Sequence, residues 1–406
     1  MPVISAPRVV AQGRVLAPGA VVIEDGHVAA VLGTRPRPAP DHLALDRGIL
    51  CPGLVDLQVN GAFGVDLIDA DRDGWSRVSR GLLGTGVTSF LPTFISAPIE
   101  TLAAGLRRAG AARDQRDQME AAGRAGSPGA RILGVHLEGP FLSERRRGAH
   151  DPAALVDPTT ERVEALLEAG AGILRLVTLA PEREGALEAV KRLTAGGVAV
   201  SVGHSDALAE PVAAAADAGA RMITHVFNAQ RGLHHREPGV AGQALADEQL
   251  TVGLIADLHH VHPAVCRIVL AAAAGRVALV TDAVAATGMP PGRYQLGGEL
   301  VELGPDGPPR RPDGTIAGSN LRLDQAVGNV AGLLSGTGTD ADAGTDADAE
   351  AGLAAAVEAA SRVPADLLGR TDLGRIEVGA LADLAWLSDT YHAVGTWIEG
   401  VQAWRA

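Results

Sequence analysis

The chain has 406 residues, of which 47% are hydrophobic, 20% are charged and only 3% are aromatic. This length allows one barrel-sized domain and a smaller one, with a core built mainly from Ala, Val, Leu and Ile. The 35 basic and 48 acidic residues give a net charge of −13, and no basic stripe interrupts this balance, which argues against nucleic acid as a partner.

The two cysteines, Cys51 and Cys266, cannot form a disulfide framework and suit a reducing compartment. Apolar runs are interrupted well before the ~20 residues that a membrane span requires. The first residues lack the basic start and apolar stretch of a secretory signal. We therefore expect a cytoplasmic protein without membrane contacts.

Residues 8–33 alternate short β-like runs with turns, and Glu24-Asp25-Gly26 between two apolar runs is typical of a β-hairpin. Similar patterns return at 374–388 and 393–404. The two ends of the chain therefore predict strands of one small β-domain. We place this domain at residues 1–52 plus 375–406, around a barrel domain at 53–374.

The middle of the chain alternates strand-length apolar runs with Ala/Leu-rich stretches of helical character. The eight runs cover 54–60, 87–94, 132–139, 173–180, 198–204, 222–228, 251–257 and 276–282. Most are almost continuously hydrophobic, as expected for strands that are buried on both faces. Eight such repeats predict a parallel α/β barrel of the (β/α)8 TIM type. Periodicity alone also allows an open doubly wound sheet, but no GxGxxG follows the first strand.

A low-complexity acidic segment, GTGTDADAGTDADAEAG, occupies residues 336–352 between two helical patterns. Its composition predicts a solvated, flexible insertion. A functional acidic tract is the alternative interpretation.

Polar side chains stand at or just after the ends of the apolar runs. In a barrel of this kind, reactive groups gather at the carboxyl ends of the strands. They are Gln58, Asn60, His136, Glu138, His204, His225, Asn228, Asp257, His260 and Asp282. Two histidines and one carboxylate form a common hydrolytic zinc set that leaves a position open for water. Glu138, His204 and His225 end the third, fifth and sixth strands, so their side chains could converge. His136 shares a strand face with Glu138, so from the residues alone either could be the third ligand.

Asp282 closes the eighth strand in the sequence LVTDA. A carboxylate at this place can accept a proton from an activated water and pass it to a leaving amine. The alternative is a helix N-cap, a position where Asp is favoured. The location of Asp282 at a barrel strand end favours catalysis.

Three loops add further candidates. Arg236, in the loop 228–239, is either an anion clamp or an ordinary solvent-facing arginine. His259, His260 and His262 follow the seventh strand and could bind a second metal or the substrate. His150 ends a basic loop after the third strand.

Taken together, the motifs PGLVDLQVNG, HLEGPFL, GAHDP, SVGHSDA, ITHVFNA, REPGVAG, LVTDA, AGSNL and GRIEVGALADLA resemble, in order, those of the N-acetylglucosamine-6-phosphate deacetylase family of the amidohydrolase superfamily. The resemblance covers nearly the whole chain. It implies a distorted (β/α)8 barrel with a small β-sandwich formed by both termini. It also implies metal-dependent hydrolysis of N-acetylglucosamine 6-phosphate to glucosamine 6-phosphate and acetate, in amino-sugar catabolism and cell-wall sugar recycling. The alternatives are N-acetylgalactosamine 6-phosphate or a cyclic amide as substrate and, more distantly, a non-catalytic ligand-binding barrel.

By this resemblance, Glu138, His204 and His225 are the metal ligands and Asp282 is the catalytic acid/base. The residues that would contact the phosphorylated amino sugar are Ala149, His150, Asn228, Ala229, Arg236, His260, Ile316, Ala317, Gly318 and Ser319. Of these, His150 would lie near the acetyl group and the sugar hydroxyls, while Asn228, Ala229 and Arg236 would hold the phosphate.

The resemblance also implies one divalent metal and a homodimer. Zn²⁺ is the expected ion, and Fe²⁺ or Co²⁺ suit the same ligands. Many superfamily members carry His-x-His at the end of the first strand and can hold a second metal. This chain has Gln58 and Asn60 there, so we interpret the place as a vestigial second-metal position. The strand-seven loop departs from the Asp-Gly-x-His of relatives, because Leu258 stands in place of the glycine, and a change in the local backbone conformation is expected there.

Overall fold

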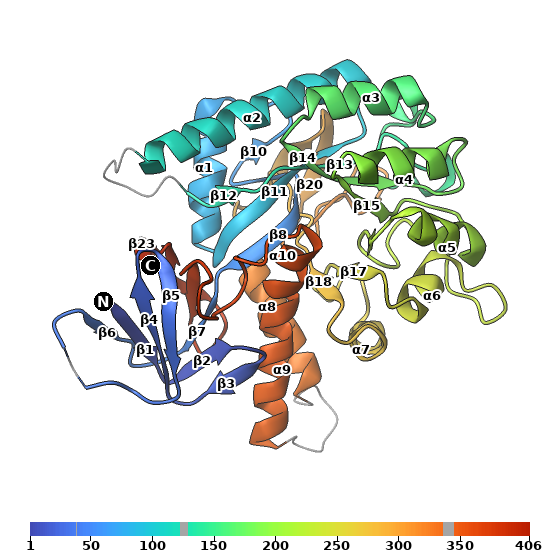
Figure 1. The fold of residues 1–406 in the computed structure, drawn as a ribbon. Helices are drawn as coiled ribbons and strands as arrows, with labels where there is room; N and C mark the ends of the chain where they lie inside the picture. The colour runs from blue at the N-terminus through green and yellow to red at the C-terminus, as the bar shows by residue number, and fades with distance from the viewer. Residues whose placement is uncertain (38, 122–128, 336–344) are drawn as a thin grey trace.

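Strands from the two ends of the chain lie side by side in one part of the molecule, as the blue and red segments of Figure 1 show. The structure is a computed structural model that describes residues 1–37, 39–121, 129–335 and 345–406. One sheet has the order β5-β4-β1-β6, made of His27–Leu32, Gly19–Glu24, Val3–Ala6 and His42–Ala44. The other has the order β23-β22-β21-β7-β2-β3, made of Val401–Arg405, Ala393–Ile398, Leu384–Leu387, Ile49–Pro52, Arg8–Ala11 and Arg14–Leu16.

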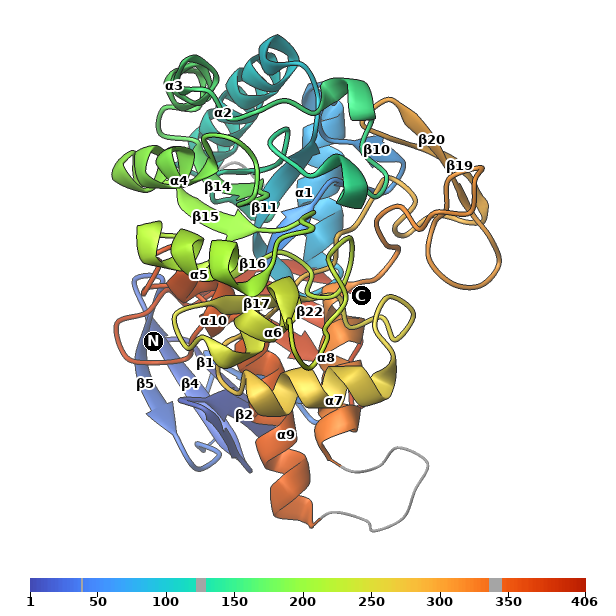
Figure 2. The same cartoon turned by 90° about the vertical axis from the view of Figure 1, so that its right-hand side faces the viewer.

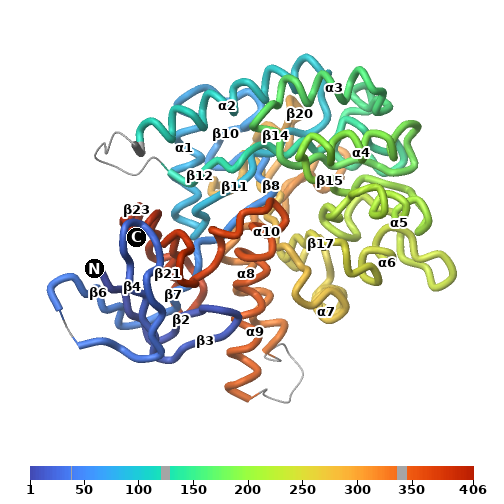
Figure 3. The backbone as a smooth tube through the Cα atoms, in the orientation of Figure 1, coloured from blue at the N-terminus to red at the C-terminus, as the bar shows by residue number. Residues whose placement is uncertain are grey.

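These two sheets share an apolar core of their own. Ile4, Val9 and Val21 from the first part of the chain pack with Trp386 and Trp397 from the last part. Because β21 pairs with β7 in antiparallel register, the C-terminal strands continue the N-terminal sheet rather than forming a separate one. The tube view of Figure 3 places both termini close to these sheets.

Eight parallel strands form the second and larger unit. They are β8 (Leu54–Val59), β11 (Val87–Ile95), β13 (Val135–Glu138), β14 (Leu174–Leu179), β15 (Ala199–Val202), β16 (Met222–Ile223), β17 (Thr251–Leu254) and β18 (Val277–Leu279). They pair in this order, and a parallel bridge between Val59 and Ala283 brings the last strand end back to the first. The sheet is therefore a nearly closed barrel, and the predicted fold class is confirmed. All nine residues of β11 are buried, as the continuous apolar pattern requires.

Helices cover the outside of the barrel (Figure 2). They are α1 (Arg72–Leu83), α2 (Ile99–Ala121), α3 (Thr160–Ala169), α4 (Ala186–Ala195), α5 (Ala209–Ala218), α6 (Gly239–Ala246), α7 (Pro263–Ala272), α8 (Leu323–Leu334), α9 (Asp346–Ala359) and α10 (Arg362–Leu367). A hairpin of β19 (Gly292–Leu296) and β20 (Glu299–Leu303) follows β18 and precedes α8 in the chain, and it projects at the upper right of Figure 2. None of the helices in the described ranges is long and apolar enough to cross a membrane.

The acidic segment at 336–352 differs from the loop that its composition predicts. Residues 336–344 lie outside the described residues, but α9 begins at Asp346, so the loop prediction is wrong for the second half of the segment. Thr345 and Asp348 form a capping box in which each side chain accepts from the other's backbone N–H. The acidic residues of the first turn also complement the helix dipole. Leu353 and Val357 then bury one face of the helix.

Candidate metal centre and active site

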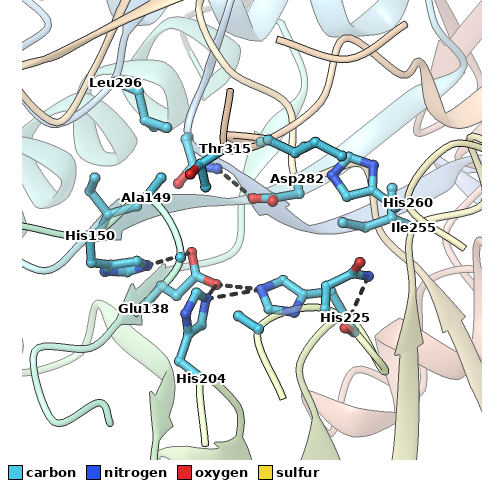
Figure 4. Close-up of a pocket in the computed structure, with 17 residues that line it drawn as sticks. Glu138, Ala149, His150, His204, His225, Ile255, His260, Asp282, Leu296 and Thr315 are labelled. Carbon is cyan, nitrogen blue, oxygen red and sulfur yellow. Dashed lines mark hydrogen bonds and ion pairs between the residues drawn. The ribbon is translucent and has the colours of Figure 1, made fainter. Parts of the chain in front are cut away.

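Three side chains predicted as metal ligands meet at the carboxyl ends of the barrel strands. Glu138 Oε1 lies 2.9 Å from His225 Nε2 and 3.1 Å from His204 Nε2, and the two imidazole nitrogens are 3.2 Å apart. The ligand atoms all lie within 4.8 Å of one another, and all three residues are buried. Within the part of the chain that the structure describes, no other group of three His, Cys, Asp or Glu side chains meets this criterion. Figure 4 shows the two rings pointing toward the Glu138 carboxylate.

The proton positions that the surroundings dictate fit a bound cation. His204 Nδ1 lies 3.0 Å from the carbonyl oxygen of Arg146, which can only accept, so Nδ1 carries the hydrogen. In the neutral ring Nε2 then holds a lone pair, which faces the carboxylate oxygen of Glu138 and the second imidazole. Such converging electron-rich atoms require a proton or a cation between them. A carbonyl that fixes the tautomer of a metal-binding histidine is a common supporting contact. The three residues therefore fit a divalent metal.

Close packing of the backbone places His204. A Cβ on Gly203 would lie 2.7 Å from Thr224 Cβ and 2.8 Å from Thr178 Cγ2, so only glycine fits at the end of β15. After this point the chain turns sharply, and His204 has a φ of 47°. His225 and Asp282 also have positive φ values, of 25° and 52°. Left-handed backbone at non-glycine residues costs roughly 1–3 kcal/mol and tends to cluster at functional sites.

His136 does not compete with Glu138 for the metal position. Its Nε2 lies 2.8 Å from Thr178 Oγ1 and its Nδ1 lies 3.3 Å from Thr93 Oγ1, so both ring nitrogens have hydroxyl partners inside the barrel. Burial lowers the pKa of His136 to about 4, which keeps the ring neutral. Of the two alternatives that the sequence left open, these contacts favour Glu138.

Asp282 lies beside the three-residue cluster and does not cap a helix, because residues 281–284 adopt neither helix nor strand. Its Oδ1 accepts hydrogen bonds from Asn60 Nδ2 at 2.8 Å and Gln58 Nε2 at 3.0 Å. The same Gln58 nitrogen donates to Glu138 Oε1 at 3.0 Å. Both residues that stand in place of His-x-His therefore bind Asp282, and Gln58 also links it to the cluster.

Burial acts to raise the pKa of both carboxylates of the site, but their neighbours shift the two pKa values in opposite directions. Burial and the charge of Glu138 raise the pKa of Asp282 to about 7. Burial opposes ionisation of Glu138 as well, but the hydrogen bonds and charges of His204 and His225 outweigh it and hold its pKa well below the usual range. Neighbouring carboxylates whose pKa values are driven apart commonly have separate tasks. Glu138 is suited to remain an anion, and Asp282 to exchange a proton near neutral pH.

His150 faces the cavity as a neutral hydrogen-bond donor. Its Nδ1 accepts from the backbone N–H of Ser96 at 3.2 Å, so the ring hydrogen is on Nε2. Burial and the neighbouring His204 lower the pKa of His150 to about 3, so the ring does not take a second proton at neutral pH. Nε2 lies 3.8 Å from Glu138 Oε2, which leaves it directed toward the space beside the cluster.

His260 is fixed by Asp257, whose Oδ2 lies 2.7 Å from His260 Nδ1. Burial alone would raise the pKa of Asp257, but the hydrogen bond and charge of His260 lower it below its usual value. The preceding Leu258 has a φ of 66°, so the loop adopts a glycine-type conformation although a leucine occupies the position.

The cavity above this cluster has a volume of about 270 Å³. Eleven of the fourteen residues predicted to bind metal or substrate or to catalyse line it: Glu138, Ala149, His150, His204, His225, Asn228, Ala229, His260, Asp282, Ile316 and Gly318. Asn60 lines it as well. Ala317 packs behind the wall with Ile95 and Leu296, and Ser319 Oγ donates to the carbonyl of Thr281 at 2.5 Å.

Arg236 lies outside this lining. The side chain is exposed, and its Nη1 is 2.9 Å from His235 Nε2. Sequence reasoning missed several lining residues: Ile95, Gly148, Ile255, Leu296 and Thr315. Ile255 lies within the seventh predicted strand run and could have been found there. Leu296 belongs to the β19–β20 hairpin, for which the barrel pattern offers no signal.

Comparison with known proteins agrees with this geometry. Residues 49–402 match the model of the amidohydrolase family. The chain is 38% identical over 380 residues to N-acetylgalactosamine-6-phosphate deacetylase of Escherichia coli O157:H7, covering 93% of both chains. It is 37% identical to N-acetylglucosamine-6-phosphate deacetylase of Vibrio furnissii, covering 93% of this chain and 89% of that one.

A solved structure extends the likeness to three dimensions. Mycobacterium smegmatis N-acetyl-D-glucosamine-6-phosphate deacetylase, in a mutant form in complex with N-acetyl-D-glucosamine-6-phosphate, superposes with a TM-score of 0.87 and 32% identity over 99% of both chains. Relatives of this identity and coverage, together with the family match, show that the chain belongs to the amidohydrolase family, in the group whose named members are deacetylases of N-acetylhexosamine 6-phosphates.

Proposed function

We propose that the protein hydrolyses the N-acetyl amide of N-acetylglucosamine 6-phosphate, giving glucosamine 6-phosphate and acetate. The observation that carries this proposal is the convergence of Glu138, His204 and His225 beside Asp282. The activities named for the Vibrio furnissii and Mycobacterium smegmatis relatives support the choice of substrate.

Glu138, His204 and His225 would hold one divalent metal ion, with Zn²⁺ as the proposed ion and Fe²⁺ or Co²⁺ suited to the same donors. Such an ion supplies Lewis acidity, which makes a water molecule a stronger acid and polarises a carbonyl group. Gln58 and Asn60 offer amide groups rather than imidazoles at the vestigial second position, so we propose a single tight ion.

Asp282 would take the proton of the attacking water and return it to the departing nitrogen. In the metal-free site, burial and the charge of Glu138 raise the pKa of Asp282 to about 7, and a carboxylate whose pKa is raised can accept a proton and later donate it. The two amide donors on Oδ1 fix the carboxylate and leave its other oxygen for the proton. The buried position excludes bulk water that would compete for this proton.

His150 would donate from Nε2 to the acetyl oxygen, where negative charge develops as water attacks. We assign the sugar hydroxyls to His150 and to the wall formed by Ala149, Ile316 and Gly318. Ala317 and Ser319, which were also predicted to contact the sugar, would support this wall from behind. Asn228, Ala229, His260 and Arg236 are proposed for the phosphate end of the substrate. Arg236 would have to turn in from its exposed position to reach a ligand in the cavity.

N-acetylgalactosamine 6-phosphate is a second candidate substrate, favoured by the name and 38% identity of the Escherichia coli relative. The two sugars differ at one hydroxyl, so the same metal and acid/base chemistry serves both. We further propose that the protein is a cytoplasmic homodimer. Light scattering would show a mass of twice 41.4 kDa for the dimer.

The proposed function is tested by metal analysis combined with acetate release. The substrates are N-acetylglucosamine 6-phosphate, its galacto isomer and unphosphorylated N-acetylglucosamine. We expect about one ion per chain, loss of activity on chelation, and the fastest turnover with the first substrate. Absence of acetate release from all three compounds by the metal-loaded protein would refute the deacetylase assignment.

A further inference from the structure

In the side-chain amide of Asn60, the nitrogen makes a hydrogen bond and the oxygen makes none. Its side chain is 3% exposed and lines the cavity. Nδ2 donates to Asp282 Oδ1 at 2.8 Å, whereas Oδ1 is buried without any hydrogen-bond partner. The orientation of the amide follows from chemistry, because the reverse orientation would place the Asn60 oxygen against a carboxylate oxygen. The unpartnered acceptor is therefore turned away from Asp282.

Buried acceptors in native proteins are nearly always hydrogen-bonded, so one that lines a ligand cavity indicates a donor supplied by water in the free protein and by the ligand that displaces this water. Among the described side chains that line this cavity, Asn60 Oδ1 is the one buried oxygen without a partner. Glu138 Oε1 already has three close partners, and Asp282 must keep an oxygen for the travelling proton.

We infer that Asn60 Oδ1 accepts the N–H of the substrate's acetamido group, so that Asn60 selects secondary amides over esters at this site. This inference rests on the proposed function. For Asp282 to protonate the leaving nitrogen, that nitrogen must come within hydrogen-bond reach of its carboxylate. Asn60 is bonded to the same carboxylate and can therefore reach the same nitrogen. A secondary amide loses its hydrating water on entry, and its N–H needs a new acceptor.

A hydrogen bond from the substrate N–H to Asn60 would also orient the lone pair of the leaving nitrogen. When the water has added to the acetyl carbon, the nitrogen becomes pyramidal and its lone pair must face the proton on Asp282. A hydrogen bond from N–H to Asn60 fixes rotation about the bond between the sugar and the nitrogen. The proton then passes from the Asp282 carboxyl to the lone pair, the carbon–nitrogen bond breaks, and the amine leaves with both its original and its new hydrogen.

The test compares the acetamide with an ester in which oxygen replaces N–H, the freshly prepared 2-O-acetyl ester of glucose 6-phosphate. The kcat/KM values of the metal-loaded protein are measured for both substrates in the wild type and in Asn60→Leu, with Asn60→Ala as a second variant of smaller volume. Gln58→Leu is the matched control, because Gln58 also donates to Asp282 Oδ1 but does not line the cavity.

We expect Asn60→Leu to lower the amide-to-ester ratio of kcat/KM by about tenfold or more. In this variant the buried N–H of the amide has no acceptor, whereas the ester has no N–H that needs one. Gln58→Leu should slow both substrates and change the ratio by less than about twofold. Equal losses on amide and ester in both Asn60 variants would overturn the inference while leaving the deacetylase proposal intact. A wild type that hydrolyses neither substrate would overturn the deacetylase proposal and the inference with it.

Discussion

Two buried carboxylates of this protein have very different surroundings. Asp383, at the seam between the barrel and the terminal sheets, is 2% exposed, and its Oδ2 lies 2.5 Å from Arg131 Nη1. Glu138, at the barrel mouth, is 3% exposed and contacts two histidines and an amide, with no arginine or lysine paired to it in the described residues. A buried charge normally requires a compensating cation. At the seam an arginine of the chain supplies that cation, whereas at the mouth the positive charge must come from protonated histidines or from a bound metal ion.

Buried charge alone therefore does not identify a functional site. The seam carboxylate also accepts the backbone N–H of Glu399 at 2.9 Å, so its acceptors are used by the fold itself. At the mouth, by contrast, Gln58 Oε1, Asn60 Oδ1 and His225 Nδ1 are buried without partners. The seam carboxylate therefore has its partners within the fold, whereas several buried polar atoms at the mouth have no partner until a ligand binds.

At the mouth, Asp282→Asn should have the largest effect. Asparagine keeps an oxygen that can accept from Gln58 and Asn60 but cannot take the water's proton. We expect turnover to fall by roughly 10²–10⁴-fold, with metal content and KM close to the wild type. Steady-state kinetics and metal analysis on the same preparation measure this. Near-normal turnover would remove Asp282 from the proposed acid/base role.

At the seam, Arg131→Met should act on stability rather than turnover. Removing one partner of a buried ion pair leaves an uncompensated charge and typically costs about 3–5 kcal/mol. Denaturant unfolding measures the change, and Arg192→Met is the control, because Arg192 pairs with Glu164 at a largely exposed site where ion pairs are worth about 1 kcal/mol or less. Equal effects of the two substitutions would contradict our interpretation of the seam.

These two regions also mark what the sequence could predict. Each of the eight apolar runs contains a barrel strand, because strands buried on both faces leave an almost continuous hydrophobic pattern. The residue types at strand ends pointed to Glu138, His204 and His225, and the barrel topology explains why they meet. The pattern could not decide between His136 and Glu138, since both lie on one strand face. Only the hydroxyl partners of His136 separate them.

Other features depend on contacts that no local pattern encodes. Gln58 Nε2 donates to Glu138, which lies 80 positions further along the chain, and to Asp282, which lies 224 positions further along. Composition was also misleading at 336–352, where alternating Asp and Ala resemble a solvated tract. The capping box at Thr345 and the apolar residues that follow favour a helix.

The pH dependence of the unfolding free energy tests the surroundings of Asp282 at the barrel mouth. The folded-state pKa of Asp282 is raised from 3.8 to about 7, so the native state holds a proton that the unfolded chain has lost. In metal-free protein, stability should therefore fall as the pH rises from about 4 to 7, by up to a few kcal/mol, on the order of 1.4 per pKa unit. Asp282→Asn should lack this component. Parallel pH profiles of unfolding free energy for both chelated proteins would contradict the prediction.

Arg236→Ala tests whether the Arg236 side chain, which is exposed at the rim of the barrel mouth, binds the substrate phosphate. If Arg236 turns in to bind phosphate, its loss should raise KM for the phosphorylated sugar by about tenfold and change kcat little, because a charge-assisted hydrogen bond is worth about 1.5 kcal/mol or more. Unphosphorylated N-acetylglucosamine should be unaffected. A similar KM increase for both substrates would assign Arg236 to loop structure instead.

The smallest expected effect concerns the strained backbone that borders the cavity. Ala229 has a φ of 50°, a conformation that glycine adopts freely and alanine does not. Ala229→Gly should therefore stabilise the protein by less than about 1 kcal/mol, because relief of strain exceeds the entropy that glycine adds to the unfolded chain. Ala213→Gly, within α5, is the control and should destabilise by about 1 kcal/mol. Denaturant unfolding measures the change in the free energy of unfolding for each substitution. Changes of opposite sign would show that the backbone at the barrel mouth is strained, whereas the backbone of an ordinary helix is not. Destabilisation by both substitutions would instead mean that the loop around Ala229 is held without strain.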